Sequence, residues 1–277
     1  MNFVPVPFID CMEEERFGGK VKSLGEACRA GLPVPPGYGV EVELVNAVVS
    51  GEAHATSAVK AAFEKMACNI AVRSSAVGED STEASFAGQH DSIMNVNSGD
   101  AVVDAIVQVF RSAHTESAYA YRAKVDVSAD ARIAVAMQEQ VPSDKAGVLF
   151  TRNPLTGAEE RYIEVSWGLG EAVVGGIVVP DSFRIAPHAD RCEVLERSPG
   201  EKDIMLVLNQ QGGTDEIKVP PERVTAPCLD DIELAKLHDL ALRCERAYGS
   251  NLDVEFAFHA GNLYLLQCRT ITVLHKL

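Results

Sequence analysis

The sequence has few basic residues for its length. Its 277 residues include 25 lysines and arginines against 40 aspartates and glutamates, which gives a formal charge of -15. Nucleic-acid-binding proteins normally present a basic face, so this balance argues against a polyanion partner. Apolar runs long enough to span a bilayer are also missing, and the first ten residues resemble no targeting signal. We therefore expect a cytoplasmic protein that binds neither nucleic acid nor membrane.

Metal-binding and disulfide patterns are missing as well. The seven cysteines are scattered, with no CxxC pair and no spacing typical of a zinc site. Their odd number and the lack of a signal segment predict reduced thiols that pack as small apolar groups. The hydrophobic share of 47% is enough for a substantial core in one large or two smaller domains.

Two alternating stretches, 253–258 and 263–269, flank Gly261 and predict a β-hairpin near the C-terminal end. If the pairing centres on Gly261, the polar side chains share one face as two opposite pairs, Glu255 with Gln267 and Asp253 with Arg269. The other face then carries the apolar side chains of both strands, namely Val254, Phe256, Phe258, Tyr264, Leu266 and Cys268. The turn itself does not fix this register, since 260–262 fits a three-residue loop only loosely.

The polar face of this hairpin has two interpretations. A carboxylate beside an amide oxygen, with a guanidinium one step along, can hold a divalent cation and its phosphates, because magnesium prefers oxygen ligands. Alternatively, the face is solvated and carries a cross-strand Asp–Arg pair worth about 0.2 to 1 kcal/mol.

The first half of the sequence contains two basic residues, Lys20 and Arg73, whose neighbours suit the binding of phosphate. Gly18-Gly19 directly before Lys20 lets the backbone approach a ligand at the start of a helix expected over 15–30, although a turn with a surface lysine is the alternative. A buried strand over 70–76 carries Arg73, whose guanidinium can bind two phosphate oxygens. The small-residue segment 85–92 that follows could fold over a triphosphate through its backbone N–H groups.

Further elements follow from periodicity. The sequence predicts helices over 101–124 and 230–248, and apolar strands over 132–141, 146–151 and 163–167. The strand ending at 141 leaves an extended backbone whose N–H and C=O groups could pair with an adenine edge.

Taken in this order, the segments resemble the ATP-binding domain of the phosphoenolpyruvate synthase, pyruvate phosphate dikinase and rifampin phosphotransferase family. The resemblance covers nearly the whole chain, and its carriers are Gly18-Gly19-Lys20, Val34-Pro35-Pro36-Gly37, Val72-Arg73-Ser74-Ser75, Ser85-Phe86-Ala87-Gly88, Gly147-Val148-Leu149-Phe150-Thr151, Asn153-Pro154, Gly168-Leu169-Gly170-Glu171, Pro180-Asp181, Asp253-Val254-Glu255 and Gln267-Cys268-Arg269.

The resemblance implies an α+β fold of the ATP-grasp class, in which two lobes, approximately 1–185 and 186–277, clamp ATP. It also implies roles for individual residues. Lys20, Arg73 and Arg269 would hold phosphates and act in catalysis, Gly88 and Ser92 would belong to a covering loop, Gln138, Glu139 and Val141 would line the adenine site, and Glu255 and Gln267 would bind Mg²⁺.

The family reaction cleaves ATP to AMP and passes a pyrophosphoryl group to a histidine on a swivelling domain. Neither that domain nor the barrel that binds pyruvate or its counterpart is expected within these 277 residues. The resemblance therefore implies a partner domain or subunit that carries the histidine. Two alternatives remain open: a stand-alone ATP-grasp kinase or ligase acting on a small molecule, and a nucleotide-binding subunit without catalysis.

Overall fold

The computed structural model describes residues 4–78, 92–115, 131–188 and 190–271, and the chain packs as two compact units. Unit 1 comprises Met1–Arg29, Pro35–Gln140 and Asn209–Gly213, and unit 2 comprises Ala30–Val34, Val141–Leu208 and Thr214–Leu277. This division differs from the expected lobes, 1–185 and 186–277. The reason is that strands before residue 186 pair with strands after it in a single sheet.

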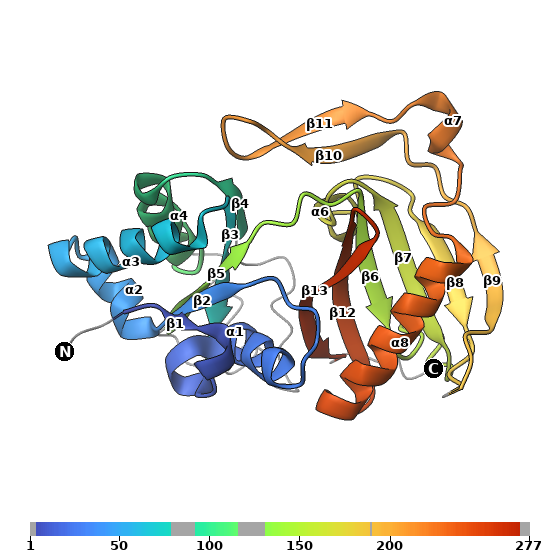
Figure 1. The fold of residues 1–277 in the computed structure, drawn as a ribbon, viewed down its shortest axis with the longest axis horizontal. Coiled ribbons are helices and arrows are strands. Elements are labelled where there is room, and N and C mark those ends of the chain that lie inside the picture. Colours follow the sequence, from blue (N-terminus) through green and yellow to red (C-terminus); the bar gives the residue numbers. More distant parts are fainter. Residues whose placement is uncertain (1–3, 79–91, 116–130, 189, 272–277) are drawn as a thin grey trace. The chain divides into compact units, whose positions relative to one another are not determined.

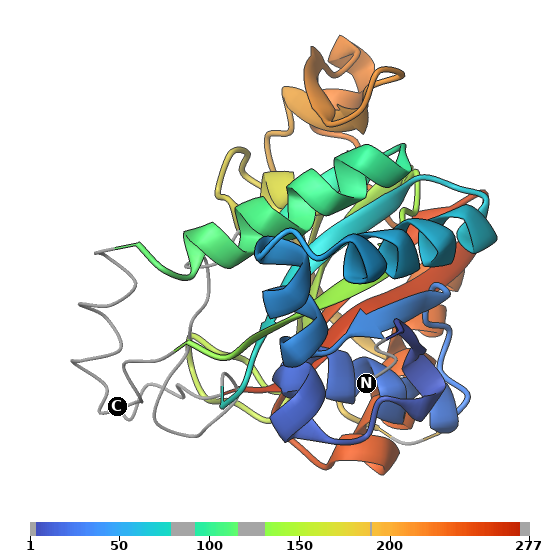
Figure 2. The same cartoon turned by 90° about the vertical axis from the view of Figure 1, so that its left-hand side faces the viewer.

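Unit 1 is built on a five-stranded antiparallel sheet of order β1-β2-β5-β3-β4. The strands are β1 (Val6–Pro7), β2 (Gly37–Val40), β3 (Ile70–Ala76), β4 (Ser92–Val96) and β5 (Ile133–Glu139). The helices are α1 (Glu14–Arg29), α2 (Val42–Val49), α3 (Ala53–Met66) and α4 (Gly99–Ser112), with a short 3-10 turn at Phe8–Asp10. Helices α2, α3 and α4 lie together beside the strands (Figure 1 and Figure 2).

Alternation along β3 divides the sheet of unit 1 into two faces. Ile70, Val72 and Ala76 are buried in an apolar core with residues of α2, α3 and α4. The side chains between them belong to the opposite face, where α1 packs against β3 and β5. Arg73 and Ser75 therefore point away from the core and toward the side of the sheet that carries α1.

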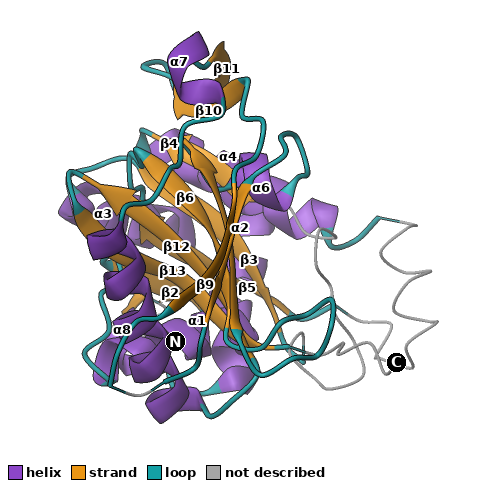
Figure 3. Cartoon of the chain, turned by 90° about the vertical axis from the view of Figure 1, so that its right-hand side faces the viewer, coloured by secondary structure: helices purple, strands orange, loops and turns teal. Residues whose placement is uncertain are grey.

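Unit 2 is built on a six-stranded antiparallel sheet of order β13-β12-β6-β7-β8-β9, with a separate hairpin of β10 and β11 (Figure 3). The strands are β6 (Lys145–Phe150), β7 (Arg161–Trp167), β8 (Asp181–Ile185), β9 (Val194–Ser198), β10 (Ile204–Leu208), β11 (Thr214–Lys218), β12 (Leu252–His259) and β13 (Asn262–Thr270). The helices are α6 (Glu171–Val174), α7 (Pro221–Val224) and α8 (Asp231–Tyr248).

Helix α8 covers one face of the six-stranded sheet and packs against β12 and β13 (Figure 1). A capping box begins the helix, since the Asp230 carboxylate accepts from the Glu233 N–H at 2.8 Å and Glu233 accepts from the Asp230 N–H at 3.1 Å. Val254, Phe256 and Phe258 of β12 are completely buried. Alternation then places Glu255 and its polar neighbours on the opposite face.

The hairpin of β12 and β13 confirms the predicted register at its polar end and corrects it near the turn. Glu255 is opposite Gln267, as expected, but Phe256 is opposite Leu265. The turn has two residues, Ala260 and Gly261, both with positive φ. A three-residue loop is therefore replaced by a shorter turn, and an extra residue in β13 restores the register as a β-bulge.

This bulge changes which side chains of β13 are buried. Leu265 is fully buried, whereas Tyr264 and Leu266, predicted to lie on the apolar core face, are only partly buried. Both pack instead against a small cluster of Val141, Ala146 and Ala257. The sequence pattern alone had no signal for a bulge, because Leu263, Tyr264, Leu265 and Leu266 are all apolar and fit either face.

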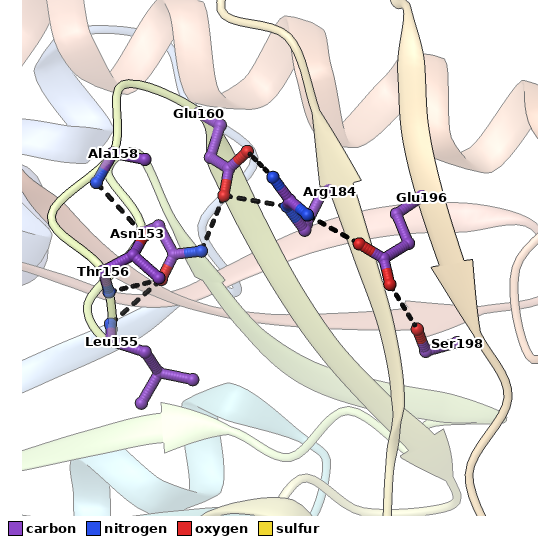
Figure 4. Close-up of polar contacts among 8 residues, drawn as sticks. All are labelled: Asn153, Leu155, Thr156, Ala158, Glu160, Arg184, Glu196 and Ser198. Atoms are coloured by element: carbon purple, nitrogen blue, oxygen red, sulfur yellow. Dashed lines mark hydrogen bonds and ion pairs between the residues drawn. The ribbon is translucent and has the colours of Figure 1, made fainter.

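The turn between β6 and β7 is fixed by a polar network (Figure 4). Asn153 accepts from the N–H groups of Leu155 and Thr156 at 2.9 and 3.2 Å, and its amide donates to Glu160 at 2.7 Å. Arg184 of β8 donates twice to Glu160, and this guanidinium lowers the pKa of the Glu160 carboxyl. The mixture of helices and sheets in the two units confirms the α+β class.

Candidate functional site

Lys20 is held against β3 by the shape of α1. The helix is interrupted at Gly18, which has φ 71° and ψ 169°, and a side chain there would place Cβ 2.2 Å from the Ser75 carbonyl oxygen. Only glycine allows this close approach. The Lys20 ammonium then donates to the Ser74 carbonyl at 2.9 Å. Lys20 is thus anchored to Ser74, the residue that follows Arg73 in β3.

Unit 1 brings several of the predicted site residues together. Arg73 Nη1 lies 3.5 Å from Gln138 Oε1, because β3 and β5 are neighbours in the sheet. Ser92, at the start of β4, is exposed and pairs directly with Arg73 in the strand register. Gly88, predicted for the covering loop, lies outside the described residues. The cationic side chains of Lys20 and Arg73 thus share one region with amide and hydroxyl groups.

The backbone after β5 is the segment expected to bind adenine. Two of its N–H groups already donate within unit 1: that of Glu139 to the Pro36 carbonyl at 2.8 Å and that of Gln140 to the Asn69 carbonyl at 3.0 Å. Val141 belongs to unit 2, where its side chain lies in the apolar cluster with Ala146 and Ala257. The three cluster residues are buried, and the partly buried side chains of Tyr264 and Leu266 pack against them.

In unit 2, the strand register places the predicted metal ligands opposite one another. Glu255 pairs with Gln267 across β12 and β13, and Asp253 pairs with Arg269 two residues along. The Arg269 guanidinium donates through Nε and Nη2 to Asp253 Oδ2 at 2.9 and 2.7 Å. One face of the ribbon thus presents a carboxylate and an amide oxygen beside a guanidinium.

Asp253 is a candidate that the sequence interpretation treated only as a partner of Arg269. Its side chain is 12% exposed, and Oδ1 makes no hydrogen bond with any described residue. Burial raises the pKa of this carboxyl, Arg269 offsets part of the rise, and the nearby Glu255 carboxylate adds to it. A buried carboxylate oxygen without a donor is an arrangement that a cation would stabilise. Alternation places Asp253 on the face of Glu255, so the sequence did contain this signal.

These donors fit magnesium better than a transition metal. Among the described residues no three His, Cys, Asp or Glu side chains gather into a metal-binding group. Magnesium needs fewer protein ligands, because one or two carboxylates are usually completed by water and substrate phosphates. Glu255 and Gln267 would hold the ion, with the Asp253 carboxylate close by.

Within the described ranges, each helix is too short or too polar to cross a bilayer.

Comparison with known proteins gives the family. The family described as "Pyruvate phosphate dikinase, AMP/ATP-binding domain" matches residues 44–277. A probable phosphoenolpyruvate synthase of Methanocaldococcus jannaschii is 33% identical, with 94% of this chain and 26% of that protein covered. Prodigiosin synthesizing transferase PigC of Serratia marcescens is 35% identical, with 96% of this chain and 32% of that protein covered. The chain thus spans about a quarter to a third of the length of these relatives.

Among solved structures, dinucleotide forming acetyl-coenzyme A synthetase 1 of Ca. Korarchaeum cryptofilum has a TM-score of 0.47 and 12% identity, with 91% of each chain covered. The α+β content of the two units agrees with the ATP-grasp class that the motifs imply. Since the family match takes in most of the sequence, from residue 44 to residue 277, the chain belongs to the family of the pyruvate phosphate dikinase AMP/ATP-binding domain.

Proposed function

We propose that this chain is the Mg²⁺-dependent ATP-binding module of a dikinase-type phosphotransferase. The observation that carries the proposal is the pairing of Glu255 with Gln267, beside Arg269, which donates twice to Asp253 Oδ2. Hard oxygen donors next to a guanidinium suit a magnesium ion that is shared with phosphate. Membership in an AMP/ATP-binding family supports ATP as the nucleotide.

Residues of both units take part in this proposal. Lys20, Arg73 and Arg269 neutralise phosphate charge, which explains how a chain of formal charge -15 binds a polyanionic nucleotide. Gln138, Glu139 and Val141 form the adenine site, and Gly88 and Ser92 cover the phosphates. The apolar surroundings of Val141, which include the partly buried Tyr264 and Leu266, support its place beside the base.

The reaction that we propose breaks the bond between the α and β phosphates. AMP leaves, and the pyrophosphoryl group is transferred to a ring nitrogen of a histidine on a partner domain or subunit. Water then releases inorganic phosphate, so that a phosphohistidine remains. The contribution of this chain is positioning and charge neutralisation by Lys20, Arg73 and Arg269. Bound magnesium would supply further neutralisation of the phosphate oxygens.

The final acceptor is separate from this half-reaction. One relative is named as a phosphoenolpyruvate synthase and another as a prodigiosin synthesizing transferase, although both match this chain over more than nine tenths of its length. A common ATP-dependent step followed by different acceptor chemistry accounts for both names. The proposal is therefore restricted to the transfer from ATP to histidine.

Analysis of the products tests the reaction. The chain is incubated with Mg²⁺ and ATP, alone and with a histidine-bearing domain of the family, and the nucleotides are separated by mass spectrometry. We expect AMP and inorganic phosphate only when the histidine domain is present. ADP formed with a small-molecule acceptor would support a stand-alone kinase or ligase instead, and ATP binding without turnover under all these conditions would support a non-catalytic subunit.

Glu255→Ala tests the metal site. We expect at least about a hundredfold loss of magnesium-dependent turnover, since the variant removes the one carboxylate of the Glu255–Gln267 pair. Folding should survive, because Glu255 lies on the face of the sheet opposite the core. Glu216→Ala on the exposed β11 is the matched control and should keep full turnover. Normal turnover in Glu255→Ala would remove this residue from the metal site.

A further inference from the structure

Helix α1 has a break that its own residues do not cap. At Gly18 the backbone leaves helical geometry, so that a new helical segment begins at Gly19. The first N–H groups of a helix have no partner within the helix, and a side chain at the residue before it normally accepts from one of them. Gly18 has no side chain to do so. The break therefore requires a hydrogen-bonding group from elsewhere in the fold.

Ser75 of β3 supplies that group. Its hydroxyl accepts from the Val21 N–H at 3.0 Å and donates to the Phe17 carbonyl at 2.7 Å. In an uninterrupted helix these two backbone groups, four residues apart, would bond to each other directly. One fully buried hydroxyl thus takes the place of that bond and holds both sides of the break.

The bonds of Ser75 also determine where Lys20 lies. Lys20 sits within the stretch that Ser75 spans, and its ammonium reaches the Ser74 carbonyl of the same strand. Arg73, two residues before Ser75, belongs to the same face of β3. The positions of both basic side chains therefore depend on the same short part of β3. Arg73 is a residue of that strand, and Lys20 is held to it through the Ser75 hydroxyl.

We infer that Ser75 is a positioning residue that sets Lys20 relative to Arg73 for binding of nucleotide phosphates. This inference rests on the proposed function, because Lys20 and Arg73 bind phosphate only under that proposal. Ser75 itself is shielded by α1 and acts through Lys20. Its effect is to keep the lysine in the competent position in the free protein, so that binding does not first have to order α1.

Ser74 offers a matched control. It is as fully buried as Ser75, but its side chain belongs to the face of β3 that packs on the apolar core. Its hydroxyl makes no hydrogen bond with any described residue. Ser74→Ala therefore removes the same atom from the neighbouring position without touching α1, and its carbonyl partner for Lys20 is kept.

A double-mutant cycle on ATP affinity tests the inference. The dissociation constant of Mg-ATP is measured by calorimetry for the wild type, Ser75→Ala, Ser74→Ala, Lys20→Ala and the Lys20→Ala/Ser75→Ala double variant. We expect Ser75→Ala to weaken binding of Mg-ATP by roughly fivefold to tenfold, because the variant loses the helix cap that holds Lys20 in its binding position. Ser74→Ala should bind as the wild type does. In the Lys20→Ala background, Ser75→Ala should cause no further loss.

The outcomes separate the inference from the proposed function. Unchanged affinity in Lys20→Ala would refute phosphate binding by Lys20 and this inference with it. Weakened binding in Lys20→Ala but not in Ser75→Ala, or additive losses in the double variant, would overturn the inference alone. If Ser75→Ala does not fold, Ser75→Cys keeps the packing with a weak hydrogen-bonding group. Faster hydrogen exchange of the Val21 amide in that variant, together with wild-type ATP affinity, would equally overturn the positioning role.

Discussion

Arg161 of β7 is only 1% exposed, and its guanidinium is held by two side chains of α8. Nη2 donates to Glu245 at 3.0 Å, and Nη1 donates to the ring of His238. A guanidinium has no acceptor, so His238 must accept and be neutral. Burial lowers the pKa of His238, and the positive charge of Arg161 lowers it further. The contact between Arg161 and His238 thus requires a neutral histidine, whereas the ion pair with Glu245 does not.

This contact predicts a loss of stability in acid. An unfolded histidine binds a proton as the pH falls through about 6.5, whereas folded His238, with its lowered pKa, does not. The unfolded state then binds more protons, so the free energy of unfolding decreases from about pH 6.5 downward, by up to about 1.4 kcal/mol per pH unit, until the folded pKa is reached. Urea unfolding at pH 7.5, 6.0 and 5.0 measures the decrease.

His238→Gln is the control for that measurement, because its amide oxygen can still accept from Arg161 and does not titrate. The difference between wild type and variant should shrink as the pH falls. If the difference in the free energy of unfolding were the same at all three pH values, His238 would have the same pKa in the folded and unfolded states.

The sequence predicted some of these residues and could not predict others. Glu255 and Gln267 follow from alternation about a turn, which is local information. The contact between Arg161 and His238 joins positions 77 residues apart and leaves no periodic signal. The same is true of Lys202, which is completely buried and pairs with Asp181, while that carboxylate also accepts from the N–H groups of Gly200 and Cys228. A sequence offers no reason to place this lysine inside the core.

Helices and strands were predictable where one face is apolar and the ends carry caps. The helix expected over 230–248 is found as Asp231–Tyr248, and the strand expected over 70–76 is Ile70–Ala76. The break inside α1 was not predictable, because its cause is the contact with β3. The bulge in β13 was not predictable either, since it depends on whether the turn has two or three residues.

The break in α1 gives a prediction for Gly18→Ala. Its Cβ would lie 2.2 Å from a backbone oxygen of β3, in addition to the strain of a positive φ. We expect a loss of at least about 3 kcal/mol in the free energy of unfolding. Gly31→Ala, near the other end of α1, has φ 69° but no atom within 4 Å, so it should lose only about 1 kcal/mol. Urea denaturation compares the two, and equal losses would show that the close approach at Gly18 is unimportant.

The chain carries a formal charge of -15 and yet is proposed to bind ATP. The three cations that the proposal uses come from both units, Lys20 and Arg73 from unit 1 and Arg269 from unit 2. Neither unit alone holds both the predicted metal ligands and the two basic side chains of the first half. A nucleotide that uses all of these residues must therefore stabilise both units.

Hydrogen exchange tests this consequence. At 100 times its dissociation constant, a ligand that binds only the folded state stabilises it by about 2.7 kcal/mol. We expect Mg-ATP to slow amide exchange both in Ile70–Ala76 of unit 1 and in Leu252–Thr270 of unit 2. Glu255→Ala, at the same concentration of Mg-ATP, should lose protection in both segments, because weaker binding affects every residue that holds the ligand. Protection confined to one unit would show that the residues of the other unit do not bind the nucleotide.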